Sequence, residues 1–383
     1  MKLRVPWSPG NATGQEGRCS VQGRSVEVPV EAEPRRRVRD AAERCRSPLR
    51  SLGIQTRHRK EPPRAIRPVR HIASEASLPA GIRCGTGARG VTFPFKNLVF
   101  EGAGVRNCAY AGALLALEAH GVFGQVEQVA GTSSGSIAAT LVSLGYTPAE
   151  IRQEMLNLDF ARIRDGNWLT GPARMFSRHG WNPGDYFLAS MEEVLARKTG
   201  DGRITFAQHR ARGFKPLYVV GTSLSARNVR VFPDEHSQDM AVADAIRISM
   251  SIPFFFASRE FQGEIYVDGG VMWNYPIDLF DGPEGYNART LGLFLDTFDQ
   301  PKPDPIYNLH DFAGSFFASL LSSQEIDLMN SPANLARSIR IDDLGLKPTE
   351  FGITREQKLA LMRQGEQATR AFLERYAASH FAA

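Results

Sequence analysis

Two predicted strands in this 383-residue chain each end in a glycine-rich turn that leads directly into a helical pattern. The apolar run Asn97–Phe100 leads into Glu101-Gly-Ala-Gly104, and the strand predicted at residues 126–130 leads into Gly131-Thr-Ser-Ser-Gly135. A short apolar run such as the first is typical of a strand buried on both faces, and parallel strands need a helical crossover between them. The order of strand, glycine turn and helix therefore predicts an α/β fold with a mainly parallel central sheet that is covered on both faces.

The alternation of strand and helix patterns continues to the end of the chain. We expect further strands at 216–220, 229–232, 264–267 and 290–295, and helices at 106–120, 137–144, 238–250 and 354–377. Thr147-Pro-Ala-Glu150 has the form of a capping box and predicts the start of another helix. These elements fit one α/β domain over residues 93–383.

The first 92 residues have a different composition. They contain 19 Lys and Arg against 8 Asp and Glu, whereas the remaining residues contain 27 against 33. Apolar residues occur singly there, so the segment cannot bury enough apolar area to offset the entropy of ordering it. We therefore expect residues 1–92 to form a disordered, Arg-rich basic tail. It is either a merely solvated extension or an electrostatic arm for anionic lipid or nucleic acid, and the basic charge gives no reason to expect nucleic-acid binding by the folded domain.

Targeting and redox signals are sparse. No stretch approaches the ~18 unbroken apolar residues of a membrane span, and no apolar core of a secretory signal follows Lys2 and Arg4. The four cysteines show no C-x-x-C spacing and are too few for a disulfide framework. We expect a cytoplasmic protein in a reducing compartment, with peripheral contact to a membrane surface as an option.

The turn Gly131-Thr-Ser-Ser-Gly135 matches the pattern Gly-x-Ser-x-Gly (GXSXG). In a sharp strand-to-helix turn, glycines on either side let the backbone pass close to itself while the central hydroxyl projects outward. The N-terminus of the following helix then points at the place where negative charge would develop. The placement favours Ser133 as a nucleophile, and the alternative is an ordinary glycine-rich turn.

The turn Gly102-Ala-Gly-Val-Arg-Asn107 also joins a predicted strand to a predicted helix. Its backbone N–H groups can form a nest that accepts an anion. One interpretation is a dinucleotide pyrophosphate site, which would require glycine at Asn107 and an acidic residue at the end of the next strand. Because Gly131–Gly135 occupies that strand end, an oxyanion hole opposite Ser133 is favoured, with a plain tight turn as the other alternative.

Asp268-Gly269-Gly270 closes the predicted strand at 264–267. Asp-Gly is a common turn signal, but a nucleophilic serine also requires a base. The histidines of the chain carry no local catalytic signature, and a carboxylate at a strand end can act instead when burial raises its pKa. The competing hypothesis is a histidine-containing triad esterase of the α/β-hydrolase type, for which His310 is the candidate after Asp268.

Taken together, these motifs resemble the patatin-like phospholipase family. The resemblance rests on Asn97–Arg106, Gly131–Gly135, Arg247–Pro253, Val267–Val271 and Asn274–Pro276, within core motifs that span residues 96–282. It implies a three-layer α/β/α sandwich and hydrolysis of phospholipid or another acyl-ester lipid, by a carboxylic ester hydrolase that needs no metal or cofactor. It also implies a catalytic dyad of Ser133 as nucleophile and Asp268 as base, without histidine. Oxyanion-hole amides would come from Gly102, Ala103, Gly104 and Val105, with Arg106, Asn107, Gly131, Gly135, Gly269 and Gly270 supporting the motifs.

Two positions depart from the family pattern, because Ala103 and Asn107 stand where glycine is usual. An alanine accepts fewer backbone conformations than glycine, whereas Asn adopts left-handed geometry more readily than most residues. These departures motivate a second alternative, a catalytically impaired lipid-binding module. Arg106 is a candidate partner for a lipid phosphate, against the alternative of a solvated residue in the first turn of the helix.

Aromatic residues gather in two segments, 159–187 and 311–321. Such segments can form an acyl-chain pocket or dip into a bilayer surface. The alternative is that they are ordinary parts of the core.

Overall fold

The computed structural model describes residues 92–298 and 305–381. The predicted basic tail, residues 1–92, therefore lies outside the described residues except for Thr92. Within the described ranges the main hydrophobic core draws residues from Phe93 to Leu373. No helix in these ranges combines the length and the apolar character that crossing a membrane requires.

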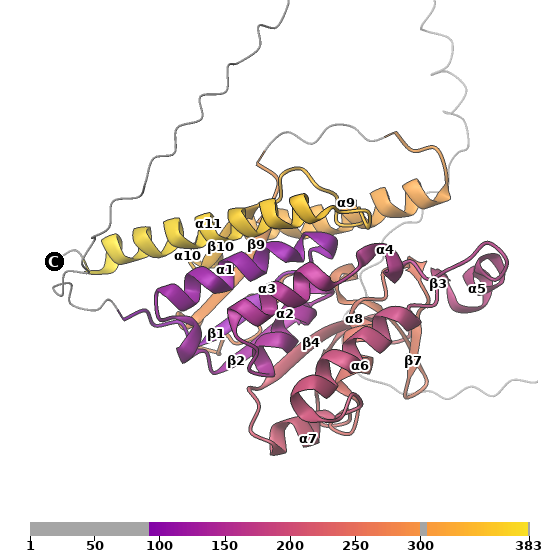
Figure 1. Cartoon of the computed structure of the whole chain (residues 1–383), viewed down its shortest axis with the longest axis horizontal. Coiled ribbons are helices and arrows are strands. Elements are labelled where there is room, and N and C mark those ends of the chain that lie inside the picture. Colours follow the sequence, from indigo (N-terminus) through magenta and orange to yellow (C-terminus); the bar gives the residue numbers. More distant parts are fainter. Residues whose placement is uncertain (1–91, 299–304, 382–383) are drawn as a thin grey trace, which may run out of the picture. The chain divides into compact units, whose positions relative to one another are not determined.

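The central sheet has the order β10-β9-β1-β2-β4-β8-β7 (Figure 1). Its first five strands pair in parallel, and they are β10 (Ser338–Asp342), β9 (Thr290–Asp296), β1 (Asn97–Phe100), β2 (Gln128–Thr132) and β4 (Leu217–Ser223). Antiparallel pairing adds β8 (Glu264–Asp268), β7 (Arg259–Phe261) and β5 (Asn228–Phe232). A separate parallel pair is formed by β3 (Gly180–Asn182) and β6 (Phe254–Phe256). The predicted α/β fold with a mainly parallel sheet is confirmed.

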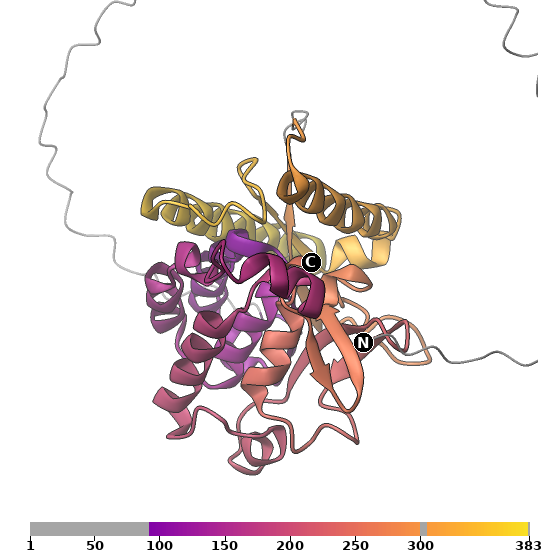
Figure 2. The same cartoon turned by 90° about the vertical axis from the view of Figure 1, so that its right-hand side faces the viewer.

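Helices cover one face of the sheet thickly (Figures 1 and 2). The main ones are α1 (Cys108–Ala119), α2 (Ser134–Ser143), α3 (Pro148–Asn157), α8 (Val242–Ser249) and α11 (Arg355–Phe381). Helices α1 and α11 cross very closely, because a Cβ at Gly112 would lie only 1.7 Å from the Met362 carbonyl oxygen. Glycine at this crossing lets the two backbones touch and fixes α11 against the sheet.

The opposite face has a thinner cover. Val99 and Ala130 of the sheet pack there against Ile277. The Tyr275 hydroxyl is hydrogen-bonded to the Ser338 hydroxyl, which donates to the Asn334 carbonyl in α10 (Pro332–Ala336). The predicted three-layer arrangement is thus present, with one layer built from the segment 275–280 and a short helix.

The remaining helices surround the carboxyl ends of the strands and the β4 side of the sheet. They are α4 (Phe160–Ile163), α5 (Gly171–Arg178), α6 (Asp185–Thr199), α7 (Phe206–Ala211) and α9 (Leu309–Met329). Helix α9 contacts the turn that follows β8, the short 3-10 helix η3 (Gly269–Val271). The long α9 therefore lies over the end of the strand that carries Asp268.

Most predicted elements occur within a few residues of their expected bounds. The helix expected at 106–120 begins with a 3-10 turn, η1 (Gly104–Asn107), before α1. The capping box is confirmed, since the Thr147 hydroxyl accepts from Glu150 N and the Glu150 carboxylate accepts from Thr147 N. The helix expected at 238–250 is shorter, because the Gln238 and Met240 carbonyls accept hydrogen bonds from the start of α7 and α8 begins only at Val242.

Candidate active site

Ser133 lies at the junction of β2 and α2. Its backbone has φ 50° and ψ −131°, a conformation that costs a residue with a side chain on the order of 1–3 kcal/mol. The flanking glycines make this turn fit: a Cβ at Gly131 would lie 2.4 Å from the Gly135 carbonyl oxygen, and a Cβ at Gly135 would lie 2.4 Å from the Glu101 carbonyl oxygen. The sharp strand-to-helix turn predicted from GXSXG is therefore present, with the strained residue at its centre.

The Ser133 hydroxyl donates a hydrogen bond to Asp268 Oδ2 over 2.7 Å. Asp268 ends β8, which runs antiparallel to β4, and β4 in turn neighbours β2. The second carboxylate oxygen, Oδ1, accepts from Gly270 N over 2.7 Å. The sheet order thus brings together two side chains that are far apart in the sequence.

Burial controls the basicity of Asp268. The carboxyl has no exposed surface, and its removal from water raises its pKa from the usual 3.8 to about 7. The hydrogen bonds from Ser133 and from Gly270 N act in the opposite direction and do not cancel this effect. A carboxylate with a pKa near neutrality accepts a proton much more readily than an exposed aspartate does.

The glycines after Asp268 are required by close packing. A Cβ at Gly269 would lie 2.4 Å from the Val220 carbonyl oxygen, and a Cβ at Gly270 would lie 2.8 Å from Asn274 Oδ1 and 3.0 Å from Asp268 Oδ1. Larger residues here would displace the strand end or the carboxylate itself.

The four predicted oxyanion-hole amides are not equivalent. Gly102 N donates to the Asn274 carbonyl, Ala103 N to the Ser134 hydroxyl and Val105 N to the Pro348 carbonyl, each over 3.0 Å. The N–H of Gly104 has no hydrogen-bond partner within the described residues. In this conformation, neighbouring oxygens therefore occupy three of the four predicted amides.

The two positions that depart from the family pattern, 103 and 107, have backbone conformations that do not require glycine. Ala103 has φ −129° and Asn107 has φ −56°, so neither residue is left-handed. The expectation that Asn107 would be tolerated through left-handed geometry is therefore wrong in its reason, since its backbone is right-handed helical. Asn107 instead donates from Nδ2 to the Ser134 carbonyl over 3.3 Å and so supports the nucleophile turn.

Arg106 does not have the predicted role at a lipid phosphate. Its side chain is buried and forms an ion pair with Asp343, and its Nε also donates to the Ala103 carbonyl over 3.2 Å. Asp343 further accepts from the Thr297 hydroxyl. Arg106 therefore ties the glycine turn to the segment after β10, which is a structural role.

Three site residues were missed by the sequence analysis. Asn274 donates from Nδ2 to Glu101 Oε1 and to the Gly102 carbonyl, each over 3.0 Å, while its Oδ1 has no partner. Burial raises the pKa of Glu101 well above its usual value. From α9, Gln324 donates to the Gly270 carbonyl and accepts from Asn274 N, each over 2.8 Å. The Asn274-Tyr-Pro276 motif marked Asn274 as part of the pattern, but nothing local marks Glu101 or Gln324.

The histidines with described side chains make other contacts. His209 bonds to the Ser143 hydroxyl, His179 to the Ser258 hydroxyl and His120 to the Ala116 carbonyl. His310, the candidate of the triad alternative, belongs to α9, and its side chain is outside the described part of the chain. Ser133 and Asp268 meet directly, with no imidazole between them. No cluster of His, Cys, Asp and Glu suited to a metal ion occurs among the residues that the structure describes.

Comparison with known proteins links this site to a family. The family model described as patatin-like phospholipase matches residues 98–281. The chain is 29% identical to the uncharacterised protein YqhO of Bacillus subtilis, over 73% of this chain and 98% of that protein. It is 30% identical to the probable lipid hydrolase 463L of Invertebrate iridescent virus 6, over 48% of this chain and 63% of that protein. Among solved structures, VipD from Legionella pneumophila covers 74% of this chain and 67% of its own, with 16% identity and a TM-score of 0.49.

Proposed function

Because residues 98–281 belong to the patatin-like phospholipase family, we propose that this chain is a lipid acyl hydrolase that cleaves fatty-acyl esters through a Ser133–Asp268 dyad. The observation that carries the proposal is the 2.7 Å contact between the Ser133 hydroxyl and a buried carboxylate whose pKa is raised to about 7. A relative with the printed name probable lipid hydrolase supports a lipid substrate. The substrate class is a phospholipid or another acyl-ester lipid.

In the first half-reaction Ser133 becomes acylated. Asp268 Oδ2 takes the hydroxyl proton while Ser133 Oγ forms a bond to the acyl carbonyl carbon. The carbonyl oxygen becomes an oxyanion, which the Gly104 N–H and the amides at the N-terminus of α2 stabilise. As the tetrahedral intermediate collapses, the C–O bond to the alcohol or lysolipid breaks, and the departing oxygen receives the proton from Asp268.

In the second half-reaction water releases the fatty acid. Asp268 accepts a proton from water as the water oxygen attacks the acyl-enzyme carbonyl. Collapse of the second tetrahedral intermediate breaks the bond to Ser133 Oγ, which regains its proton from Asp268. The cycle leaves both residues unchanged and needs no further reactant.

Labelling with a fluorophosphonate tests the nucleophile. We expect covalent modification of Ser133 in the unchanged protein, none in Ser133→Ala, and strongly reduced labelling in Asp268→Asn. Hydrolysis of a phospholipid vesicle should be lost in both variants. Labelling at another residue, or hydrolysis that persists in Ser133→Ala, would contradict the proposal. Lipid binding without labelling or hydrolysis would favour the impaired lipid-binding module.

A His310→Ala variant separates the dyad from the histidine triad. Because Ser133 already donates directly to Asp268, we expect this variant to keep its activity toward acyl esters. A loss comparable to that of Asp268→Asn would favour the triad.

Contact with a lipid surface forms the second part of the proposal. Exposed apolar side chains occur at and before α5 and at the start of α9, two segments that meet where Phe176 and Leu309 line one cavity. This set, called the apolar patch, comprises Trp168, Leu169, Phe176, Ile306, Tyr307, Leu309, Phe312 and Phe316. Phe176 is 88% exposed, and a group of such side chains is typical of a surface that meets a membrane or another apolar partner. Basic Arg178 is exposed on the same short helix, an arrangement that suits an anionic bilayer surface.

Vesicle flotation tests this contact. We expect a chain that begins at Gly90 to float with anionic vesicles, and the double variant Trp168→Ser, Phe176→Ser to float less. If only the full chain floats, the basic tail provides the contact and the patch does not.

A further inference from the structure

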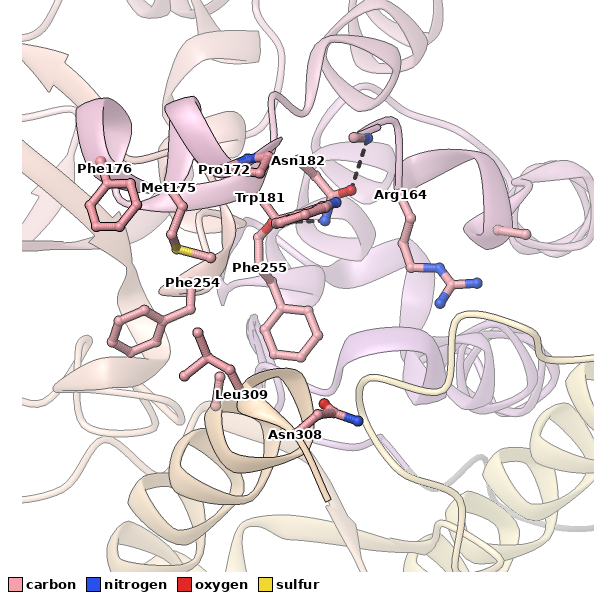
Figure 3. A pocket seen from close by; sticks show the side chains of 13 residues that line it. Arg164, Pro172, Met175, Phe176, Trp181, Asn182, Phe254, Phe255, Asn308 and Leu309 are labelled. Carbon is pink, nitrogen blue, oxygen red and sulfur yellow. Dashed lines mark hydrogen bonds between the residues drawn. The ribbon is translucent and has the colours of Figure 1, made fainter. Parts of the chain in front are cut away.

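A large cavity lies between the aromatic segment 159–187, β6 and the start of α9. It has a volume of about 670 Å³, and its walls include Met175, Trp181, Phe254, Phe255, Leu309 and Ala313. The side chains of Met175, Phe254, Phe255 and Leu309 point into the same space (Figure 3). The two aromatic segments thus meet around one cavity instead of forming only solid core.

The wall also contains three polar side chains, those of Arg164, Asn182 and Asn308 (Figure 3). Asn182 uses its amide on the backbone, because Nδ2 donates to the Phe255 carbonyl over 2.7 Å and Oδ1 accepts from Gly166 N over 2.9 Å (Figure 3). Trp181 is fitted closely between two glycines, since a Cβ at Gly166 or Gly171 would lie within 2.7 Å of its ring. The cavity therefore offers an apolar ligand a firm wall without an unsatisfied hydrogen-bonding group from Asn182.

Helix α9 connects this cavity to the candidate active site. Leu309 and Ala313 line the cavity, and Phe317 and Leu321 follow at the same helical spacing of four residues. Leu321 reaches the turn after Asp268, because a Cβ at Gly270 would lie 3.1 Å from Leu321 Cδ2. At 1.5 Å per residue, Leu309 and Leu321 are about 18 Å apart along the helix. One face of α9 therefore extends from the apolar cavity to the turn beside Asp268.

A second cavity lies along this route. It has a volume of about 490 Å³ and shares Phe255 with the first cavity. Phe317 and Pro348 also line it, together with the charged residues Asp311, Lys347 and Glu350. The carbonyl of Pro348 accepts a hydrogen bond from Val105 N, next to Gly104. The two cavities therefore adjoin at Phe255, and this series of cavities extends from Met175 and Trp181 to Pro348, whose carbonyl contacts the glycine turn.

We propose that this series of cavities beneath α9 is the binding site of a long fatty-acyl chain. The proposal rests on the proposed acyl hydrolase function. The ester carbonyl lies at Ser133 and Gly104, the first methylenes pass Phe317 and Phe255, and the methyl end occupies the large cavity. Each methylene that leaves water strengthens binding by roughly three- to fourfold, so the cavities select for long chains over short ones.

Filling the far cavity tests the length preference. We expect Ala313→Phe to lower kcat/KM toward p-nitrophenyl palmitate by more than about tenfold and to change kcat/KM toward the butyrate ester by less than about twofold, since only the long chain reaches Ala313. Ala378→Phe, on the exposed side of α11, introduces the same group elsewhere and should change neither rate. Equal losses on both esters, or no loss on palmitate, would overturn the proposal.

A second variant tests the same cavity without enlarging a buried side chain. Ala161 lines the same cavity at an exposed position, so Ala161→Phe should be accommodated and should again reduce only the palmitate rate. A rate unaffected by both cavity variants would exclude the far cavity from acyl binding.

Binding without turnover provides an independent measurement. In Ser133→Ala we expect stearic acid brominated near its methyl end to quench the fluorescence of Trp181, and the quenching to fall sharply in Ser133→Ala with Trp181→Phe. The matched change Trp168→Phe removes an exposed tryptophan and should retain the quenching. Absence of quenching would overturn the acyl site even if Ser133-dependent butyrate hydrolysis occurs. Quenching without hydrolysis of any ester would refute the proposed function alone.

Discussion

The Ser133 hydroxyl and Asp268 Oδ2 are joined by a 2.7 Å hydrogen bond between residues that are 135 positions apart in the chain. Both side chains are buried, and Asp268 has no cationic partner among the causes that shift its pKa. The pair therefore combines a short proton-transfer distance with a carboxylate of unusual basicity.

Activity should rise with pH around neutrality. Burial raises the pKa of Asp268 to about 7, so the carboxyl is protonated below that pH and cannot accept the Ser133 proton. We expect kcat/KM toward a neutral ester to increase about tenfold for each pH unit below the midpoint and to level off above it. The measurement is a pH profile with p-nitrophenyl butyrate. A rate that is flat from pH 5 to pH 8 would argue against Asp268 as the base.

Replacement of Asp268 should stabilise the protein at alkaline pH. Because its folded-state pKa is raised, the folded protein binds a proton that the unfolded chain releases between pH 4 and pH 7. The stability linked to this carboxyl is therefore present below about pH 4 and is lost as the pH rises to about 7. At about 1.4 kcal/mol per pKa unit, Asp268→Asn should raise the free energy of unfolding at pH 8 by a few kcal/mol.

The stability gain should shrink as the pH is lowered toward 4, which thermal unfolding at several pH values can follow. Glu284→Gln removes an exposed carboxylate and serves as the control, with little expected effect. A gain of the same size at pH 4 and pH 8 would show that burial of the charge is not its cause.

Removal of Arg106 should damage the fold instead of phospholipid recognition. Arg106→Ala leaves the buried Asp343 carboxylate without its ion-pair partner, and breaking such a pair costs about 3–5 kcal/mol. We expect a lower melting temperature and losses of similar size on a phospholipid and on p-nitrophenyl butyrate. An intact fold with a selective loss on the phospholipid would restore the phosphate-binding role.

Gly104 should tolerate no side chain. It has φ 57°, and a Cβ there would lie 2.0 Å from the Pro348 carbonyl oxygen. We expect Gly104→Ala to lower kcat by about 10²-fold or more, as loss of an oxyanion donor does.

Gly121→Ala is the matched control for this change. Gly121 has φ 74° with open space around its Cβ position, so both variants share the conformational strain and only Gly104→Ala meets Pro348. Comparable activity in the two variants would exclude Gly104 from the oxyanion hole.

The sequence predicted much of the frame around the site. Local patterns placed β1, β2 and β8, and the glycines at 131 and 135 predicted the sharp turn at Ser133, because tight turns leave a direct mark on residue type. The family resemblance supplied the pairing of Ser133 with Asp268. The local patterns alone left a histidine triad as an alternative, since the residues next to Ser133 and Asp268 do not indicate which side chain each of them contacts.

Local sequence determined where this chain turns and which backbone positions require glycine, because sterics act between near neighbours. Only the tertiary structure decided which amides remain available, that Arg106 pairs with Asp343, and that Asn274 and Gln324 support the turn beside Asp268. It also set the basicity of Asp268 and joined two distant aromatic segments around one cavity. Burial, hydrogen-bond occupancy and cavity shape depend on contacts between remote segments, which no local pattern records.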